Sequence, residues 1–289
     1  MTAPSDYRNA IFAGGGSRCL WQVGFWDGAN RAGLGLSETV DYAASTSAGC
    51  AMALAVMLDR GPEALALFKD LTAKNPANIH WANLRPGSGG PLLPHINMYR
   101  QALEQFLRPE DLEKLSARRV EFLMARFPRL LPSSLGTLLA FTVYGLEKHL
   151  TGTLHPTWTR KLGFTPVVAS NADAVSVADL VDSVLASSCV PPVLPGEGYR
   201  GQRVLDGGII DNVPAHLADG RKGRTLVLLS KRYKTPLPTG GARVYVQPSQ
   251  QITIDKFDYA NPQGLQETYD LGFRDGERFA GKGGQGDGL

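Results

Sequence analysis

The sequence predicts an α/β fold, a three-layer α/β/α sandwich around a mostly parallel central sheet. Short apolar runs of strand length alternate with longer segments of helical periodicity between residues 9 and 280. Such alternation favours parallel pairing, with helices over both faces of the sheet. No repeat or linker interrupts it, so we expect a single domain over 9–280 and a flexible, glycine-rich tail over 281–289.

Composition limits the classes of function. The chain has 289 residues, 43% of them hydrophobic, so a sizeable core can form, and its formal net charge is only +3. This charge argues against a nucleic acid as partner. The three cysteines, Cys19, Cys50 and Cys189, are too few and too scattered for a disulfide framework or a metal cluster. We therefore expect neither a metal nor a cofactor.

Two segments bear on location. Residues 1–8 lack a basic stretch followed by an apolar run, so no signal peptide is expected. The longest uncharged run, 130–146, contains a proline and two glycines and is too short for a transmembrane helix. The sequence predicts a cytoplasmic protein, either freely soluble or bound peripherally to a membrane.

A glycine run follows the first predicted strand. Residues 9–13 are apolar and of strand length, residues 19–31 have helical periodicity, and Gly14-Gly15-Gly16-Ser17-Arg18 lies between them. Bare backbone N–H groups at a helix N-terminus can point at an anion. The run lacks the Gly-Lys-Ser/Thr of a P-loop, and Cys19 stands where a dinucleotide fingerprint has its third glycine. The anion can thus be a phosphate or a developing oxyanion.

The second strand leads into a serine-rich turn. Residues 40–55 predict a strand and a helix joined by Ser45-Thr46-Ser47-Ala48-Gly49. A serine at the sharpest point of such a turn is typical of a nucleophile elbow, usually Gly-x-Ser-x-Gly. Because Ser45 replaces the first glycine, the motif is weakened. A Ser/Thr cap before a buried helix is the alternative interpretation.

The rest of the chain continues the alternation. Helical patterns cover 63–74, 97–107, 177–187 and 265–279, and strand patterns cover 120–127, 164–170 and 225–230. The apolar segment 130–150 is predicted to be helical, either as a core helix or as a flap over an apolar pocket that meets lipid. A further strand ends at Asp206, where two glycines allow a sharp turn, and Asn212 is expected to cap a short helix.

Three features then share one position in the predicted sheet. Gly14–Gly16, Ser47 and Asp206 each follow the C-terminal end of a predicted parallel strand, the edge at which open α/β sheets bind ligands. A nucleophile, a loop of N–H donors and a carboxylate are the minimum for acyl transfer.

With these motifs the sequence resembles the patatin-like phospholipase family, which is similar in fold to cytosolic phospholipase A2. The family's Gly-Gly-Gly-x-Arg/Lys loop, serine elbow, Ala-Ser-x-x-x-Pro segment and Asp-Gly-Gly/Ala motif are matched in order at 14–18, 45–49, 186–191 and 206–208. The resemblance implies a dyad of Ser47 and Asp206 without histidine. It also implies an oxyanion hole from Gly14, Gly15 and Gly16, orientation of that loop or of an anionic head group by Arg18, and an elbow formed by Ser45, Ala48 and Gly49 around Ser47.

The function implied is hydrolysis of the carboxylic esters of phospholipids or lysophospholipids through an acyl-enzyme. The alternatives are an esterase or acyltransferase acting on other acyl esters, and a lipid-binding protein with impaired catalysis. None of the five histidines ends a strand in a glycine-rich turn, and only His216 lies near Asp206, while Asp211 is assigned to the turn. The expected partners are a lipid or acyl-ester substrate and, transiently, a membrane surface. The oligomeric state is left open.

Overall fold

The computed structural model describes residues 5–84, 90–128, 132–151, 154–155, 158–196 and 198–285. Its strands form one sheet in the order β4-β3-β2-β1-β6-β7, and β5 pairs with β3 outside this path. Parts of the predicted apolar segment (130–131) and of the predicted tail (286–289) lie outside the described residues. The strands are β1 (Tyr7–Phe12), β2 (Tyr42–Thr46), β3 (Arg119–Arg126), β4 (Thr165–Ser170), β5 (Val204–Asp206), β6 (Arg224–Leu228) and β7 (Arg243–Val246).

The sheet is mostly parallel, as predicted. Strands β3, β2, β1, β6 and β7 all run in one direction. Strands β4 and β5 are antiparallel to β3. The prediction that Asp206 ends a parallel strand is therefore wrong, because β5 approaches the sheet from the opposite direction. Its three residues carry no local pattern that encodes strand direction.

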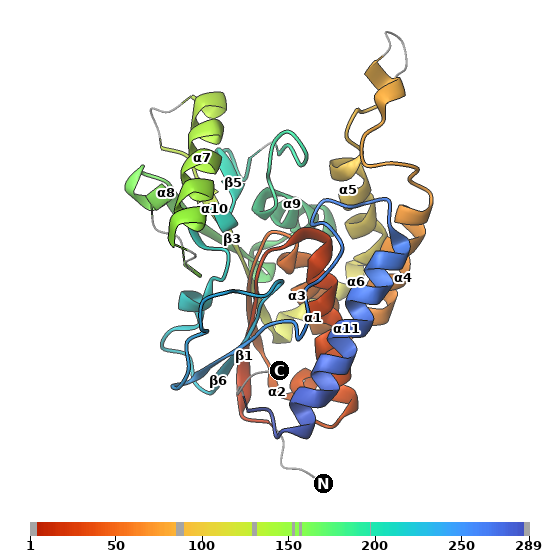
Figure 1. Ribbon diagram of the computed structural model, residues 1–289, viewed down its shortest axis with the longest axis vertical. Coiled ribbons are helices and arrows are strands. Elements are labelled where there is room, and N and C mark those ends of the chain that lie inside the picture. The colour runs from red at the N-terminus through yellow and green to blue at the C-terminus, as the bar shows by residue number, and fades with distance from the viewer. Residues whose placement is uncertain are drawn as a thin grey trace.

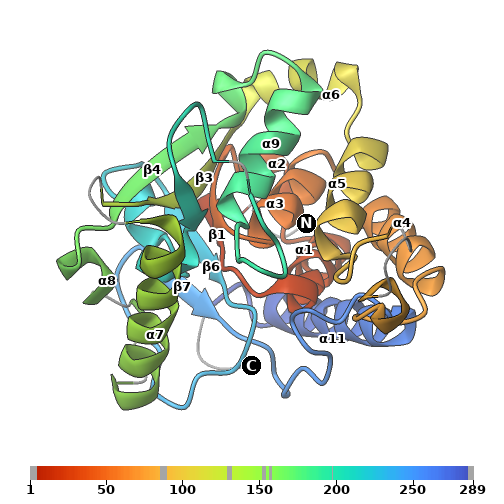
Figure 2. The same cartoon turned by 90° about the horizontal axis from the view of Figure 1, so that it is seen from above.

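Helices cover both faces of the sheet, so the predicted three layers are present (Figures 1 and 2). Alternate residues of β1 enter different cores: Ala10 and Phe12 pack under one set of helices, and Ile11 packs on the other face. The helices are α1 (Leu20–Arg31), α2 (Leu36–Thr39), α3 (Gly49–Met57), α4 (Gly61–Ala73), α5 (His95–Phe106), α6 (Pro109–Lys114), α7 (Ser133–Thr151), α8 (Trp158–Lys161), α9 (Val177–Ser187), α10 (Gly208–Asp211) and α11 (Pro262–Gly281).

The two faces differ in how they are covered. The larger core lies under α1, α3, α4, α5, α9 and α11. The opposite face is covered by α7, α10 and the short 3₁₀ helix η5 (Ala215–Ala218). In Figure 1 the sheet is seen nearly edge-on between these two groups. Among the described residues, no helix combines the length and the apolar character needed to cross a bilayer.

The N-terminal helix is held by the C-terminal one. A Cβ at Gly24 or Gly28 of α1 would lie about 2 Å from a backbone carbonyl oxygen of α11, and Gly272 and Gly276 face α1 in the same way. Glycines four residues apart on both helices thus let the two backbones touch. This packing fixes α1 directly behind the glycine loop. Beyond α11, the carbonyl of Gly284 accepts a hydrogen bond from Tyr7.

Candidate active site

Ser47 occupies a strained turn between β2 and α3. Its φ is +56°, in the left-handed region, which costs a non-glycine residue about 1 to 2 kcal/mol. The following Ala48 is the N-cap of α3. A Cβ at Gly49 would lie 2.5 Å from the carbonyl oxygen of Phe12, so only glycine allows α3 to pack this closely against β1. The strand, turn and helix predicted around Ser47 are all present.

Ser45, which stands where the usual motif has glycine, is fully buried. Its hydroxyl donates a hydrogen bond to the carbonyl oxygen of Glu121 in β3 at 2.8 Å. The side chain is small enough to fit between strand and helix, and its polar atom is satisfied. The substitution thus adds a side-chain link from the elbow to the neighbouring strand.

Ser187, at the end of α9, holds the turn in place and was not predicted to do so. Its buried hydroxyl accepts a hydrogen bond from the backbone N–H of Ser47 at 3.1 Å and donates one to the carbonyl oxygen of Leu123 at 2.7 Å. The same segment also contacts the carboxylate strand, because Asp206 N–H donates to the Cys189 carbonyl at 2.8 Å. The Ala-Ser-x-x-x-Pro motif was the only sequence signal for this role.

The register of the sheet brings Ser47 and Asp206 together. Strand β4 pairs along one edge of β3, so β2 and β5 share the other edge, end to end. Thr46, the last residue of β2, pairs with Leu123, and Asp206, the last residue of β5, pairs with Met124. Because consecutive residues of β3 face the two strand ends, the elbow and the carboxylate meet at one point.

Asp206 is almost buried, with 8% of its surface exposed. Its Oδ1 accepts a hydrogen bond from the N–H of Gly208 at 2.6 Å. A Cβ at Gly207 would lie 2.2 Å from the carbonyl oxygen of Leu123, so glycine is required where the turn passes β3. Tyr144 of α7 lines the same cleft, where burial, with a smaller effect from the nearby Asp206 charge, raises the pKa of its phenol above the usual value.

The glycine loop lies directly beside Ser47. A Cβ at Gly14 would be 3.0 Å from the Cβ of Ser47. The N–H of Gly14 donates to the carbonyl of Asn212 at 3.2 Å, and its carbonyl accepts from the Nδ2 of Asn212 and from Ser230. Asn212 is therefore not the N-cap predicted; it clamps the loop through Gly14. Because the N–H of Gly14 already donates to Asn212, the predicted oxyanion hole is left with the backbone N–H groups of Gly15 and Gly16.

Arg18 lines the cleft and contacts the segment that contains Ile254 and Asp255. Its Nε donates to the carbonyl of Ile254 at 2.9 Å, and its guanidinium pairs with the exposed Asp255 at 3.3 Å. Two lysines that the sequence did not single out, Lys231 and Lys256, line the cleft as well. With Arg18 they give it a basic side. The predicted contact of Arg18 with an anion stays a prediction.

The histidine nearest in sequence to Asp206 is engaged elsewhere. The Nδ1 atoms of His155 and His216 each lie 3.0 Å from a different oxygen of the buried Asp211. Burial alone would raise the pKa of Asp211, but the hydrogen bonds from these two histidines outweigh it and lower the pKa. Asp211 is not among the residues that line the cleft, whereas Asp206 is. Its predicted assignment to the turn agrees with its bond to the N–H of Val213.

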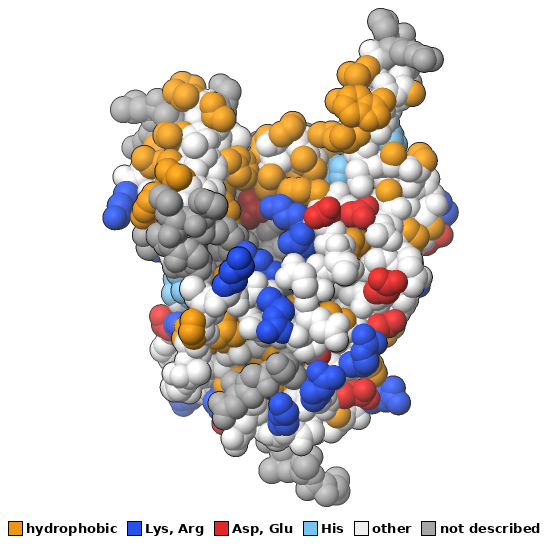
Figure 3. Space-filling model, viewed as in Figure 1, with side chains coloured by type: hydrophobic (Ala, Val, Ile, Leu, Met, Phe, Trp, Pro, Cys, Tyr) orange, Lys and Arg blue, Asp and Glu red, His pale blue; other side chains and the backbone are white. Residues whose placement is uncertain are grey.

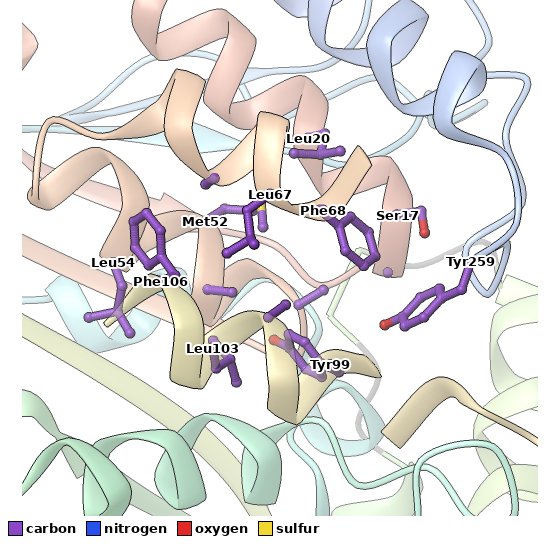
Figure 4. Close-up of a pocket in the computed structure, with 15 residues that line it drawn as sticks. Ser17, Leu20, Met52, Leu54, Leu67, Phe68, Tyr99, Leu103, Phe106 and Tyr259 are labelled. Atoms are coloured by element: carbon purple, nitrogen blue, oxygen red, sulfur yellow. The ribbon is translucent and has the colours of Figure 1, made fainter. Parts of the chain in front are cut away.

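Two cavities lie next to the elbow. A cleft of about 270 Å³ is lined by Ser47, Asp206 and the glycine loop, with Phe141 and Tyr144 of α7 on its wall. A second, narrow cavity of about 60 Å³ runs between α3, α4 and α5 and is almost entirely apolar (Figure 4). Gly16 lines both cavities, and Ala48, the residue after Ser47, lines the apolar one. The far end lies between Leu54 and Phe106.

A strained serine, a carboxylate and a glycine loop at one end of a mostly parallel sheet are typical of α/β acyl hydrolases. The chain matches the family model for patatin-like phospholipase over residues 10–219, or 210 of its 289 residues. It therefore belongs to the patatin-like phospholipase family, as the motifs predicted, and this family consists of lipid acyl hydrolases. No curated protein matches the chain. Among solved structures it is similar to VipD from Legionella pneumophila, with 11% identity, a TM-score of 0.43, and coverage of 97% of this chain and 68% of that one.

Proposed function

We propose that the protein hydrolyses carboxylic esters of phospholipids or lysophospholipids through a dyad of Ser47 and Asp206. The observation that carries this proposal is the placement of two cavities beside the elbow: Ser47 lines one, Ala48 lines the other, and Gly16 lines both. A polar cleft holds the serine and the carboxylate, and an apolar cavity begins at the next residue. This arrangement suits a substrate with a polar head and an aliphatic acyl chain.

The proposed reaction proceeds through an acyl-enzyme. Asp206 accepts the proton of the Ser47 hydroxyl as the oxygen attacks the ester carbonyl carbon. The N–H groups of Gly15 and Gly16 hold the negatively charged oxygen of the tetrahedral intermediate. Collapse breaks the bond to the leaving alcohol, which takes the proton from Asp206. Water then attacks the acyl-enzyme, gives its proton to Asp206, and the proton returns to Ser47 as the fatty acid leaves.

The lining of the apolar cavity supports an acyl chain as its occupant. Its lining residues on α3 run from Ala48 to Leu54, a span of about 9 Å along the helix at about 1.5 Å per residue. Its walls are side chains such as Leu103 and Phe106, which offer an acyl chain apolar contact and no charge. We assign this cavity to the acyl group and the wider cleft to the head group.

The proposal is tested with soluble p-nitrophenyl esters of increasing chain length and with short-chain phospholipids. Ser47→Ala and Asp206→Asn are each expected to lower turnover on the order of 10⁴-fold, because the two groups act as a unit. His216→Ala serves as the matched control and should keep turnover within about tenfold, since its ring contacts Asp211 and not Asp206.

Each other outcome has a clear meaning. If His216→Ala loses as much turnover as Ser47→Ala, the enzyme uses a triad and the proposed dyad is wrong. If Ser47→Ala keeps full turnover, another residue is the nucleophile. A wild-type protein that binds lipid without cleaving any ester would be a binding protein, and acyl transfer to an added alcohol in preference to water would make it an acyltransferase.

A further inference from the structure

Two groups of exposed apolar side chains rise on either side of the cleft mouth (Figure 3). The first, called here the 79–84 tip, lies on and beside the 3₁₀ helix η2 (Trp81–Leu84) between α4 and α5. The second, called here the α7 ridge, lies on α7. The members of the tip are Ile79, Trp81 and Leu84, and those of the ridge are Leu135, Leu138 and Leu146. Trp81 and Leu138 are 66% and 67% exposed.

The α7 ridge is the reverse of an ordinary amphipathic helix. At about 100° per residue, Leu135, Leu138 and Leu146 fall within about 80° of one another around the helix axis. The buried Ala140 and Glu147 lie on the opposite side. A surface helix normally turns such a leucine stripe toward the core. Here the stripe points away from the protein, while Tyr144 of the same helix lines the cleft.

The 79–84 tip is fixed to the other wall of the cleft. At its base, the Nδ2 of Asn75 donates to the carbonyl of Tyr259 at 2.8 Å. Asn78 exchanges two hydrogen bonds with the same segment, one to the Asp258 carboxylate and one from the N–H of Tyr259. This segment directly follows Lys256, which lines the cleft. The tip is therefore tied to the active-site wall at three points.

Both groups project from the edge of the sheet at which β1 and β2 end (Figures 1 and 3). The cleft lies between them. Among the described residues, its lining includes the basic side chains Arg18, Lys231 and Lys256 and a single carboxylate, Asp206. Two apolar projections thus flank a basic depression. A flat surface that touched both projections would lie over the lysines, so that anionic groups on it would face them.

We propose that the 79–84 tip and the α7 ridge insert together into the surface of a lipid bilayer. This inference rests on the proposed function, because a bilayer that spans both projections supplies substrate to the cleft. A protein spanning them would instead close the cleft. Tryptophan favours the membrane–water interface, and leucines on one helix face insert at the boundary of the acyl chains. Lipid phosphates then lie within reach of the basic residues of the cleft.

The experiment measures binding to vesicles in the Ser47→Ala background, so that the bilayer is not consumed. Trp81→Asp and Leu138→Asp should each lower the vesicle-bound fraction on the order of tenfold, because a charge replaces an apolar anchor. Phosphatidylcholine vesicles with added phosphatidylglycerol should bind the unaltered tip and ridge more tightly than phosphatidylcholine alone. In the active protein the same two changes should leave turnover of a soluble ester within twofold, on the order of ordinary surface substitutions.

Val175→Asp is the matched control. Val175 is 89% exposed and follows β4, which runs antiparallel to β3, so it lies at the edge of the sheet opposite the cleft. Its replacement should leave vesicle binding unchanged. The proposal is overturned if the protein does not bind vesicles, if the Trp81 and Leu138 variants bind as well as the parent, or if Val175→Asp loses binding equally. A dimer that dissociates in Trp81→Asp or Leu138→Asp would also overturn it, since a second copy would then cover the surface.

The two hypotheses can fail independently. Vesicle binding without hydrolysis of any soluble ester would leave the docking surface intact and refute the proposed function. Hydrolysis of soluble esters without vesicle binding would support the proposed function and refute the docking surface.

Discussion

Replacing Ser187 by alanine tests how the strained elbow is held. The change removes the acceptor for the Ser47 N–H and the donor to the Leu123 carbonyl. Losing the partner of a buried polar group costs about 1 to 3 kcal/mol. The left-handed backbone of Ser47 itself costs about 1 to 2 kcal/mol, so this loss is enough for the turn to relax.

The expected effect appears in turnover more than in substrate binding. A loss of about 1 to 3 kcal/mol would lower the population of the strained turn, and with it kcat, by about 5-fold to 150-fold. KM for a soluble ester should change little, because Ser187 is not among the residues lining either cavity. The assay compares kcat, KM and the free energy of unfolding in denaturant for the same variants.

Ser188→Ala provides the control from the adjacent position. Ser188 is as buried as Ser187, but its hydroxyl donates to the carbonyl of Val184 within its own helix. Its loss should cost some stability and leave kcat within a factor of two or so, on the order of an ordinary helix hydrogen bond. If Ser187→Ala keeps full kcat, or if both alanine variants lose kcat in proportion to stability, Ser187 does not position the elbow.

Two further changes probe the glycine loop and a partly buried carboxylate. In Gly15→Ala the added Cβ would lie 2.3 Å from the Ser230 hydroxyl, so the loop must shift. Turnover of a soluble ester should then fall on the order of 10²-fold. Unchanged turnover would show that the loop takes no part in the reaction. Burial raises the pKa of Asp27 to about 6, even though the Tyr269 hydroxyl donates to its carboxylate. The folded state then binds this proton more tightly than the unfolded state, so its contribution to stability is present below about pH 4 and is lost as the pH rises through about 6. Asp27→Asn should therefore raise the free energy of unfolding at neutral pH by roughly 1 to 3 kcal/mol and leave it little changed near pH 4, as measured in denaturant; equal effects at both pH values would contradict this.

Most helices and strands could be predicted because the spacing of apolar residues along the sequence shows which side chains are buried. The helix predicted over 177–187 has those bounds in the structure. Strand β1 and strand β6 are apolar runs because helices cover both of their faces. Strand β7 was missed, since it has only four residues and begins with Arg243, so its pairing with β6 depends on tertiary contacts.

In the candidate site, too, residues with a local sequence signal were predicted, and those that depend on distant contacts were not. Ser47, the glycine loop and the glycines after Asp206 were identified because each turn needs a particular residue type at a fixed place. Asn212 and Ser187 could not be assigned their contacts, because these reach partners about 200 and 140 residues away in the chain. The lysines of the cleft were missed for a related reason. Isolated basic residues on loops carry no periodic or turn signal.

The direction of β5 bears on the proposed dyad, which has no histidine. Had β5 been parallel to β3, its start and not Asp206 would have lain at the end of β2. Because β5 is antiparallel, Asp206 and Thr46 face neighbouring residues of β3, about one strand residue or 3.3 Å apart along the edge. In the proposed mechanism this short offset lets the two short side chains act without a bridging imidazole, which would need a wider gap. His216 is in any case held by Asp211. The proposed chemistry of Asp206 thus follows from a strand direction that local sequence does not encode.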